Sequence, residues 1–500
     1  MTEKKEIYTL VWDIKKHAKD FGLDPFETIF EIVTFEEMNI LASYGGFPCR
    51  YPHWNFGMEY EELEKSYTYG LHKIYEMVVN TDPCYAYLLE CNNPIDQKIV
   101  IAHVFAHSDF FKNNGYFQHT NRKMLDEIAN HGSRIRGYIE KHGEEEVGNF
   151  IDSSLSITSD LIDPESVFRK EQPKLEEELD EEDDVKRVGA VKEFPEYMRE
   201  FINPEDFIEQ QKKELEEKKK EKKKFPESPQ KDTLLFLIEN APLKSWQRSI
   251  LSMLREESYY YAPQAATKII NEGWAAYWHS KILTERCLTD SDLVDYADHH
   301  SGTLGGNRPG ALNPYKLGIE LFRDIEERWD KGRFGKEYNE CEDFEKKKNW
   351  DKKLNLGRQK IFEVRKIYND INFIDEFLTE ELCERLKLFN YEYNPKMHTY
   401  EIADRDFKKV KMRLLLMLTN FGKPVIVLED ANYNNRSELY LRHGYEGREL
   451  RIDYVKDTLK NINALWQRPV HLETVVGGNK VLFSFDGKEH HESKFGEWMK

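Results

Sequence analysis

Apolar and polar positions follow one pattern in the first two thirds of the chain and another in the last quarter. From residue 6 to about residue 335, apolar side chains mostly recur at spacings of three and four, which is typical of amphipathic helices. Beyond about residue 370, short runs alternate between apolar and polar positions, which is typical of half-buried strands. We therefore predict an α+β multidomain protein, with a mainly α-helical N-terminal region and a smaller C-terminal α+β domain.

In the N-terminal region, the pattern predicts helices interrupted by an aromatic loop. Residues 6–42 are expected to form two helices, the second opened by Pro25. Residues 43–57 combine glycines and prolines with aromatic residues, which breaks regular structure while still requiring burial. A further helix is expected to reach about Val79, followed by a strand or extended segment at residues 86–90.

The C-terminal region repeats an order of two strands followed by one helix. Alternating runs separated by turn residues predict hairpins, and the segments between them have helical periodicity. The expected strand pairs are 386–393 with 398–403, 425–429 with 439–443, and 470–476 with 480–485, and the expected helices are 406–420 and 454–466.

Residues 168–232 contain few apolar side chains. An acidic run at 176–184 is followed by a Lys/Glu-rich run at 210–224. A segment of this composition cannot bury enough apolar surface to offset the conformational entropy lost on ordering. We predict an exposed, partly disordered linker here. The predicted division is a helical core in two parts, 1–167 and 233–335, separated by the linker 168–232 and followed by the α+β domain 370–490.

Composition limits the classes of function. The formal net charge of −19 argues against a general nucleic-acid binder, because binding phosphates requires an excess of Lys and Arg on some face. The six cysteines are scattered and form no CxxC pair, which is typical of a reducing compartment. No stretch approaches the ~18 apolar residues of a membrane span, and no export signal is visible at the N-terminus. We therefore expect a cytoplasmic protein.

Two distant segments each place candidate metal ligands on one face of a helix. The helix expected to begin near Pro94 carries His103 and His107 four residues apart, and a later helix carries Glu272 and His279 seven apart. Because an α-helix has ~3.6 residues per turn, both spacings bring the side chains to one side. The same residues also fit a structural interpretation, in which Glu272 and His279 form an ordinary ion pair in a helical core.

Five unusual motifs together resemble the stage V sporulation protein R (SpoVR) family. The similarity runs from about residue 6 to near residue 485. The resemblance implies a cytoplasmic protein that acts in forming the peptidoglycan cortex of the spore, although the family also occurs in bacteria that do not sporulate. It implies no known reaction and no catalytic residue. The motifs are GFPCRYPHW at 46–54, IAH at 101–103, NAPLKSWQR at 240–248, NEGWAAYWH at 271–279 and NPY at 313–315.

The candidate ligands suggest a metal-dependent hydrolase. Zinc hydrolases commonly use two histidines one helical turn apart and a carboxylate from a second helix, so His103, His107 and Glu272 would hold zinc or another divalent metal. The short segment around Glu272 resembles the helix that carries the third metal ligand in gluzincin metallopeptidases. The chain departs from HExxH, however, because Val104 occupies the position of the general base.

Two functions from different classes remain open at this stage. The first is a hydrolase acting on an amide or similar bond in a peptide or cell-wall precursor, with His279 as fourth ligand or acid/base and Glu90 as a further catalytic candidate. The second is a non-catalytic scaffold that holds partner proteins during cortex assembly. The sequence does not rank Glu90 against other carboxylates that could replace the missing base, which are Glu36, Glu37 and Asp109.

Overall fold

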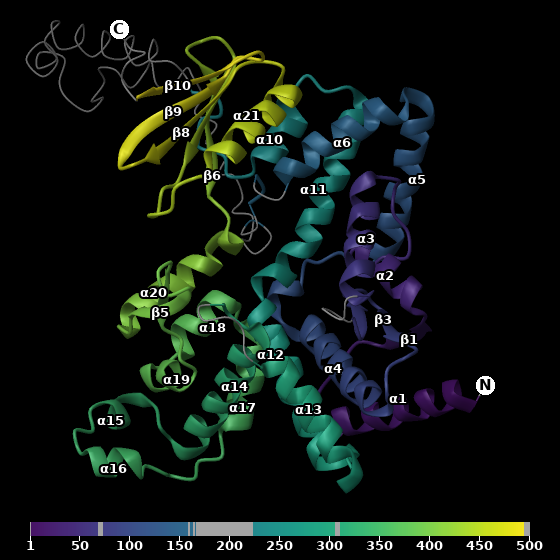
Figure 1. The fold of residues 1–500 in the computed structure, drawn as a ribbon, viewed down its shortest axis with the longest axis vertical. Coiled ribbons are helices and arrows are strands. Elements are labelled where there is room, and N and C mark those ends of the chain that lie inside the picture. Colours follow the sequence, from purple (N-terminus) through teal and green to yellow (C-terminus); the bar gives the residue numbers. More distant parts are fainter. Residues whose placement is uncertain are drawn as a thin grey trace, which may run out of the picture. The chain divides into compact units, whose positions relative to one another are not determined.

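The computed structural model describes residues 2–68, 74–158, 161–163, 166, 224–305 and 311–494 (Figure 1). The chain divides into two compact units, each formed by two separate stretches of sequence. The first unit comprises Met1–Asp152 and Ser252–Lys423, and the second comprises Ser153–Leu251 and Pro424–Lys500. Most of the linker predicted at 168–232 lies outside the described residues, and the four-part division of the chain stays a prediction.

The first unit contains a three-stranded sheet in the order β1-β3-β2. β1 (Thr28–Val33) pairs in parallel with β3 (Cys84–Leu89), and β2 (Glu76–Val79) pairs with the other edge of β3 in antiparallel orientation. β3 is buried along most of its length, as expected for the central strand. The strand expected at residues 86–90 is thus confirmed.

Two of the predicted helices are wrong where the structure forms β1 and β2. The segment after Pro25 carries Ile29, Ile32 and Val33, whose spacing also fits a helix, but these β-branched side chains are stiff at χ1 and favour strands. Pairing with β3 decides between the two conformations. The helix α2 (Phe35–Ser43) starts only after β1, and α3 (Trp54–Thr68) ends before β2 begins.

Three helices form the centre of the first unit. α4 (Pro94–Asn113) begins after Asn93, whose side chain accepts a hydrogen bond from the backbone N–H of Asp96, and this start agrees with the prediction. Every side chain from residue 99 to residue 111 is buried, so α4 is enclosed on all sides. α12 (Lys268–Ile282) packs against α4 and also against α14 (Pro314–Lys331).

α12 and α14 approach closely at a pair of glycines. Gly273 of α12 faces Gly318 of α14, and a Cβ atom built on either residue would clash with the backbone of the opposite helix. The absence of side chains at both positions therefore sets the spacing of these two helices.

The other helices and a hairpin complete the first unit. The boundary between the units falls within two long helices, α6 (Glu144–Thr158) and α11 (Ser245–Ala266). The remaining elements are α1 (Thr2–Asp20), α5 (Met124–His142), α13 (Leu293–Leu304), α15 (Gly335–Asn339), α16 (Phe344–Lys348), α17 (Gly357–Ile367), α18 (Asp370–Phe377), α19 (Glu380–Arg385), β4 (Asn390–Asn394), β5 (Thr399–Asp404) and α20 (Phe407–Leu418).

The second unit is built on a five-stranded sheet in the order β10-β9-β8-β7-β6. The helix α21 (Ile452–Trp466) connects the parallel strands β7 and β8 and buries Val455, Leu459 and Ile462. The strand pairs and helices predicted for the C-terminal region are confirmed, so the chain is α+β overall. The elements are α10 (Thr233–Asn240), β6 (Ile426–Tyr433), β7 (Glu438–His443), β8 (Val470–Val476), β9 (Asn479–Phe485) and β10 (His490–Lys494).

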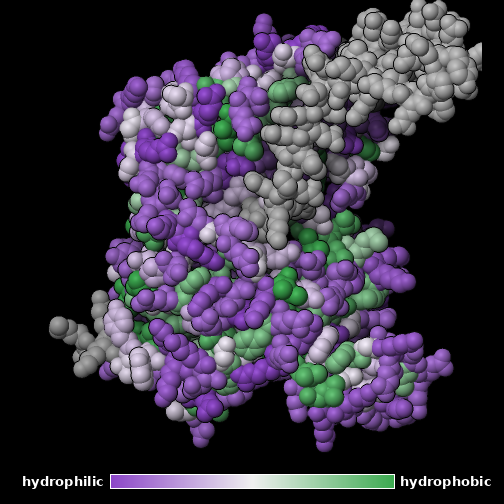
Figure 2. All heavy atoms as spheres, turned by 180° about the vertical axis from the view of Figure 1, so that it is seen from behind, coloured by the Kyte–Doolittle hydropathy of each residue, from purple (hydrophilic) through white to green (hydrophobic). Residues whose placement is uncertain are grey.

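The surface is rich in polar side chains. Figure 2 shows a mostly hydrophilic face with hydrophobic residues in separate patches, in keeping with a chain of which 33% is charged. Among the helices that the structure describes, none is both long and apolar enough to traverse a bilayer.

Candidate metal centre

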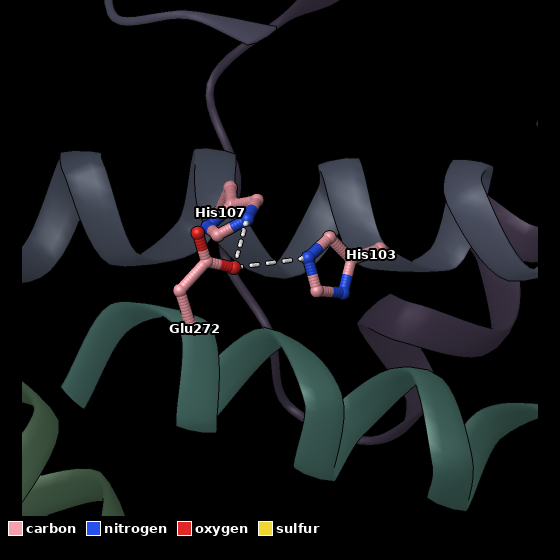
Figure 3. Close-up of side chains that lie close together, drawn as sticks. All are labelled: His103, His107 and Glu272. Atoms are coloured by element: carbon pink, nitrogen blue, oxygen red, sulfur yellow. Dashed lines mark ion pairs between the residues drawn. The ribbon is translucent and has the colours of Figure 1, made fainter. Parts of the chain in front are cut away.

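Three of the residues singled out from the sequence meet between α4 and α12. His103 and His107 lie one turn apart on α4, with ring centroids 4.5 Å apart, and they are 5% and 6% exposed. Glu272 extends from α12 toward both rings (Figure 3). Residues separated by more than 160 positions in the sequence therefore form one cluster.

The distances within the cluster fit a shared cation better than direct hydrogen bonds. Glu272 Oε2 lies 3.4 Å from the Nε2 atom of His103 and 3.4 Å from that of His107. Both separations exceed the usual hydrogen-bond range, and Oε2 is buried without a hydrogen-bond partner. Metal–ligand bonds of 2.0–2.1 Å in a tetrahedral site place two donor atoms roughly 3.3 Å apart. The donor set and its spacing therefore suit a small divalent cation such as zinc.

The outer nitrogen of each histidine is held by a second residue. The Nδ1–H group of His107 donates to Asn271 Oδ1 at 2.9 Å, which leaves the Nε2 lone pair directed at Glu272. His103 Nδ1 lies 3.0 Å from His279 Nδ1. Such outer contacts fix the tautomer and the ring orientation of metal-binding histidines.

His279 therefore lies outside the three-residue cluster and contacts it through His103. It contacts His103 and not Glu272, so the expected Glu272–His279 ion pair does not form, and Glu272 pairs with the two α4 histidines instead. Within the described part of the chain, His103, His107 and Glu272 form the group whose ligand atoms all lie within 4.8 Å of one another. A fourth-ligand or acid/base role for His279 stays a prediction.

The electrostatics of the cluster keep the carboxylate ionised. Burial by itself would raise the pKa of Glu272, but the two histidines outweigh this effect and hold the pKa well below its usual range. Burial and the neighbouring His107 lower the pKa of His103. Burial opposes protonation of His107 too, yet Glu272, Asn271 and Glu76 together raise its pKa. An ionised carboxylate and a neutral imidazole are the forms that bind metals.

Sequence analysis missed two further members of this region. Glu76, at the start of β2, is within electrostatic range of His107 and Glu272, and desolvation raises the pKa of its carboxyl to about 7, opposed by His107 and reinforced by Glu272. Tyr315, from α14, stacks on His103 with ring centroids 6.0 Å apart. Burial and the nearby charges of Glu272 and Glu76 raise the pKa of Tyr315.

The reasons for missing these two residues differ. Glu76 lies in a segment predicted to be helical, so its position on a strand facing α4 could not be foreseen. Tyr315 belongs to the NPY motif, which was noted for the family resemblance alone. The NPY motif could therefore have pointed to Tyr315 as a residue of this region, whereas no motif in the sequence points to Glu76.

The carboxylates considered as replacements for the missing base lie elsewhere. Glu90 is exposed in the turn that follows β3, outside the three-residue cluster. Glu37 caps the start of α2 through Thr34, and Glu36 lies in the same first turn. Asp109 is fully buried, 2.7 Å from Arg365. The structure thus does not bring Glu90 to the cluster, and its catalytic role stays a prediction.

Val104 is fully buried in the hydrophobic core. It follows His103 on α4, where HExxH would place a glutamate, and its surroundings leave no polar function for this position. Any base acting at the cluster must therefore come from another element.

Comparison with known proteins covers nearly the whole chain. The family model described as SpoVR like protein matches residues 2–423, and the model described as SpoVR-like C-terminal domain matches residues 424–477. Uncharacterized protein YcgB of Escherichia coli (strain K12) is 29% identical over 488 residues, which cover 92% of this chain and 90% of that protein. No solved structure matches the chain significantly.

Proposed function

Because the chain belongs to the SpoVR family, we propose that it is a cytoplasmic protein that acts in building the peptidoglycan cortex of the spore. We further propose that it does so as a metal-dependent hydrolase, with His103, His107 and Glu272 holding zinc or another divalent cation. The substrate would be a peptide or a cell-wall precursor containing an amide or similar bond. The observation that carries this proposal is the buried Oε2 atom of Glu272, 3.4 Å from two histidine nitrogens and without a hydrogen-bond partner.

The residues around the cluster have roles that suit hydrolysis. A divalent cation bound there would polarise a substrate carbonyl and activate water. Glu76 supplies a carboxylate beside the ligands, in place of the base that Val104 cannot provide. Tyr315 places a phenol next to Glu272, where it can donate a hydrogen bond. His279 and Asn271 orient the two imidazoles through their Nδ1 atoms.

One observation favours a second function. Burial of Val104 removes the base from its usual place in HExxH, and a metal held only by buried ligands can also serve as a structural tie between α4 and α12. In that case the protein would be a scaffold that holds partner proteins during cortex assembly. The two functions share the metal and differ in whether Glu76 is needed.

Metal analysis of purified protein tests the site itself. The wild type should contain about one equivalent of zinc or another divalent metal, and His103→Ala and Glu272→Ala should each lose it because three donors are needed. Circular dichroism should show that both variants retain helix. His119→Ala is the matched control, because His119 is exposed and is not one of the three clustered residues. A wild type that is folded and free of metal would remove the hydrolase mechanism.

Glu76→Gln separates the hydrolase from the scaffold. This variant should keep the metal, because Glu76 is not one of the three ligands. A hydrolase should then lose cleavage of muropeptide-type substrates, by ~100-fold or more for a lost general base. Wild type that binds metal and cleaves none of these peptides, with Glu76→Gln indistinguishable from it, would favour the scaffold.

A further inference from the structure

The first unit contains a cavity whose lining includes none of His103, His107 and Glu272. Its volume is about 260 Å³, and its walls come from the N-terminal end of α14, the chain entering β4, and one face of α20. This size is slightly below the range of ~300–1,000 Å³ typical of pockets for drug-sized molecules. The cavity is therefore suited to a small ligand.

The cavity has an apolar floor and a cationic rim. Leu317, Val410 and Leu414 form the floor and are 2%, 2% and 8% exposed. Lys316 and Arg413 lie at the exposed rim together with Lys387. The 16 lining residues include no Asp or Glu, although acidic residues outnumber basic ones by 92 to 73 in the whole chain. The local charge is thus opposite to that of the protein.

In the part of the chain that the structure describes, no carboxylate pairs with the rim cations. Arg413 donates a hydrogen bond to the neutral Asn390 Oδ1 at 3.1 Å, and within the described residues none of the three rim cations forms an ion pair. Of the three lysines on the same helix outside the cavity, two form ion pairs, and Lys408 forms none with a described residue. Lys409 and Lys411 pair with aspartates at 2.7 and 2.9 Å. The three cations around the cavity are therefore not neutralised by any carboxylate that the structure describes.

We propose that this cavity binds a small amphipathic anion. Its apolar chain would cover the floor formed by Leu317, Val410 and Leu414, where burial of apolar surface is favourable. Its carboxylate or phosphate headgroup would meet the three rim cations, with which anionic oxygens form strong charge-assisted hydrogen bonds. The two parts of the ligand thus match two regions of the cavity that differ in polarity.

Calorimetric titration of the full chain with short amphiphiles tests this site. The probes are octanoate and octyl phosphate, used below micelle-forming concentrations, with inorganic phosphate and octyltrimethylammonium for comparison. Saturable binding of either octyl anion is expected, and the preferred one identifies the headgroup as carboxylate or phosphate. The proposal is overturned if neither octyl anion binds, if the octyl cation binds as tightly, or if inorganic phosphate matches octyl phosphate.

Three variants locate the binding. Arg413→Glu reverses a rim charge at an exposed position and should weaken binding at least ~10-fold. Ala311→Trp fills the cavity from its exposed edge and should abolish binding. Lys408→Glu makes the same charge change on α20 outside the cavity and should alter affinity less than ~2-fold. Equal weakening by Lys408→Glu and Arg413→Glu would instead indicate a general charge effect and refute the site.

Discussion

Each imidazole of the candidate metal centre uses its two nitrogen atoms differently. Nε2 is directed at the Glu272 carboxylate, whereas Nδ1 contacts Asn271 or His279. This division holds the two imidazoles in fixed orientation, and it requires the Nδ1 partners as much as the clustered residues. The contacts of Asn271 are therefore open to a direct test.

Asn271→Ala should weaken zinc affinity by ~10–100-fold while leaving the three ligands in place, because His107 would lose the acceptor that fixes its tautomer. Competition with a chromophoric chelator measures the affinity. Lys268→Ala, at an exposed position on the same helix, is the control and should bind zinc as the wild type does. Unchanged affinity in Asn271→Ala would show that the outer contact is dispensable.

The sequence could predict part of the three-residue cluster, because helical spacing brings His103 over His107, but that spacing does not place Glu272 beside them. It could not predict Glu76 or the role of Asn271. Strand pairing between distant segments brings Glu76 within electrostatic range of the cluster, and Asn271 acts through a hydrogen bond whose geometry depends on how α4 and α12 pack. Local periodicity carries no information about either.

At the scale of elements, the position of α12 is determined at its N-terminus and at its contact with α14. The first residues of α12 have no side-chain cap from Thr267. Instead, the backbone N–H groups of Ile269 and Ile270 donate to the carboxylate of Asp370 at 2.9 and 2.8 Å. A residue from α18 therefore supplies the cap of the helix that carries Glu272.

The pKa of Asp370 predicts a pH dependence of stability. Burial raises it from 3.8 to about 7, opposed by the two backbone hydrogen bonds and reinforced by Glu272. A group whose pKa is higher in the folded state stabilises that state fully below pH ~4, and this contribution is lost as pH rises through about 7. The free energy of unfolding should therefore fall between pH 5 and pH 8 in the wild type.

Asp370→Asn should reduce this fall, because an amide does not ionise. Urea unfolding at pH 5 and pH 8 measures the difference between the variants. Asp375→Asn, an exposed aspartate on the same helix, should retain the wild-type pH dependence. Identical pH profiles for wild type and Asp370→Asn would contradict the prediction.

Gly318→Ala should destabilise the first unit by ~1–3 kcal/mol, since the added methyl group would meet the backbone of α12 and force the helices apart. Thermal or urea unfolding measures the loss. Gly137→Ala is the matched control, because Gly137 lies on the exposed face of α5 with no atom within 4 Å of a built Cβ. That substitution should be neutral or stabilising by up to ~1 kcal/mol.

The sequence identified the central helices correctly but mistook β1 for a helix. Ile29, Ile32 and Val33 satisfy the spacing rules of a helix, and the competing partner, β3, lies more than 50 residues further along the chain. Strand pairing of this kind is a tertiary interaction that overrides a local pattern. The role of the two glycines at the α12–α14 crossing likewise depends on the packing of both helices, so it could not be predicted from either segment alone.

At the scale of the whole molecule, each unit has a core of its own although neither is continuous in sequence. The family models divide the chain between residues 423 and 424, at the same point as the later boundary of the two units. The alternation of apolar and polar positions could indicate the change from helices to strands in the C-terminal region. It could not show that the β4–β5 hairpin belongs with the first unit, because that assignment depends on contacts between distant segments.

Leu459→Ala should destabilise the second unit by ~2–5 kcal/mol, because Leu459 is fully buried on α21. Metal content of the purified protein should not change, since all three ligands lie in the first unit. Ile101→Ala, at a fully buried position on α4, is the counterpart and should weaken metal retention as well as stability. Loss of metal in Leu459→Ala with the first unit folded would show that the units do not act separately.

The burial of α4 on every side has a consequence for biosynthesis. Its enclosing partner α12 is translated more than 150 residues later, which at ~5–20 residues per second leaves the nascent helix uncovered for on the order of ten seconds. During that interval a ribosome-bound chain exposes apolar side chains of α4 that the folded protein buries, among them Ile99, Ile101, Phe105 and Phe110. We therefore expect chaperones to bind the nascent chain mainly at this helix. We also expect a delay in translation before residue 268 to lengthen the time for which the helix is exposed.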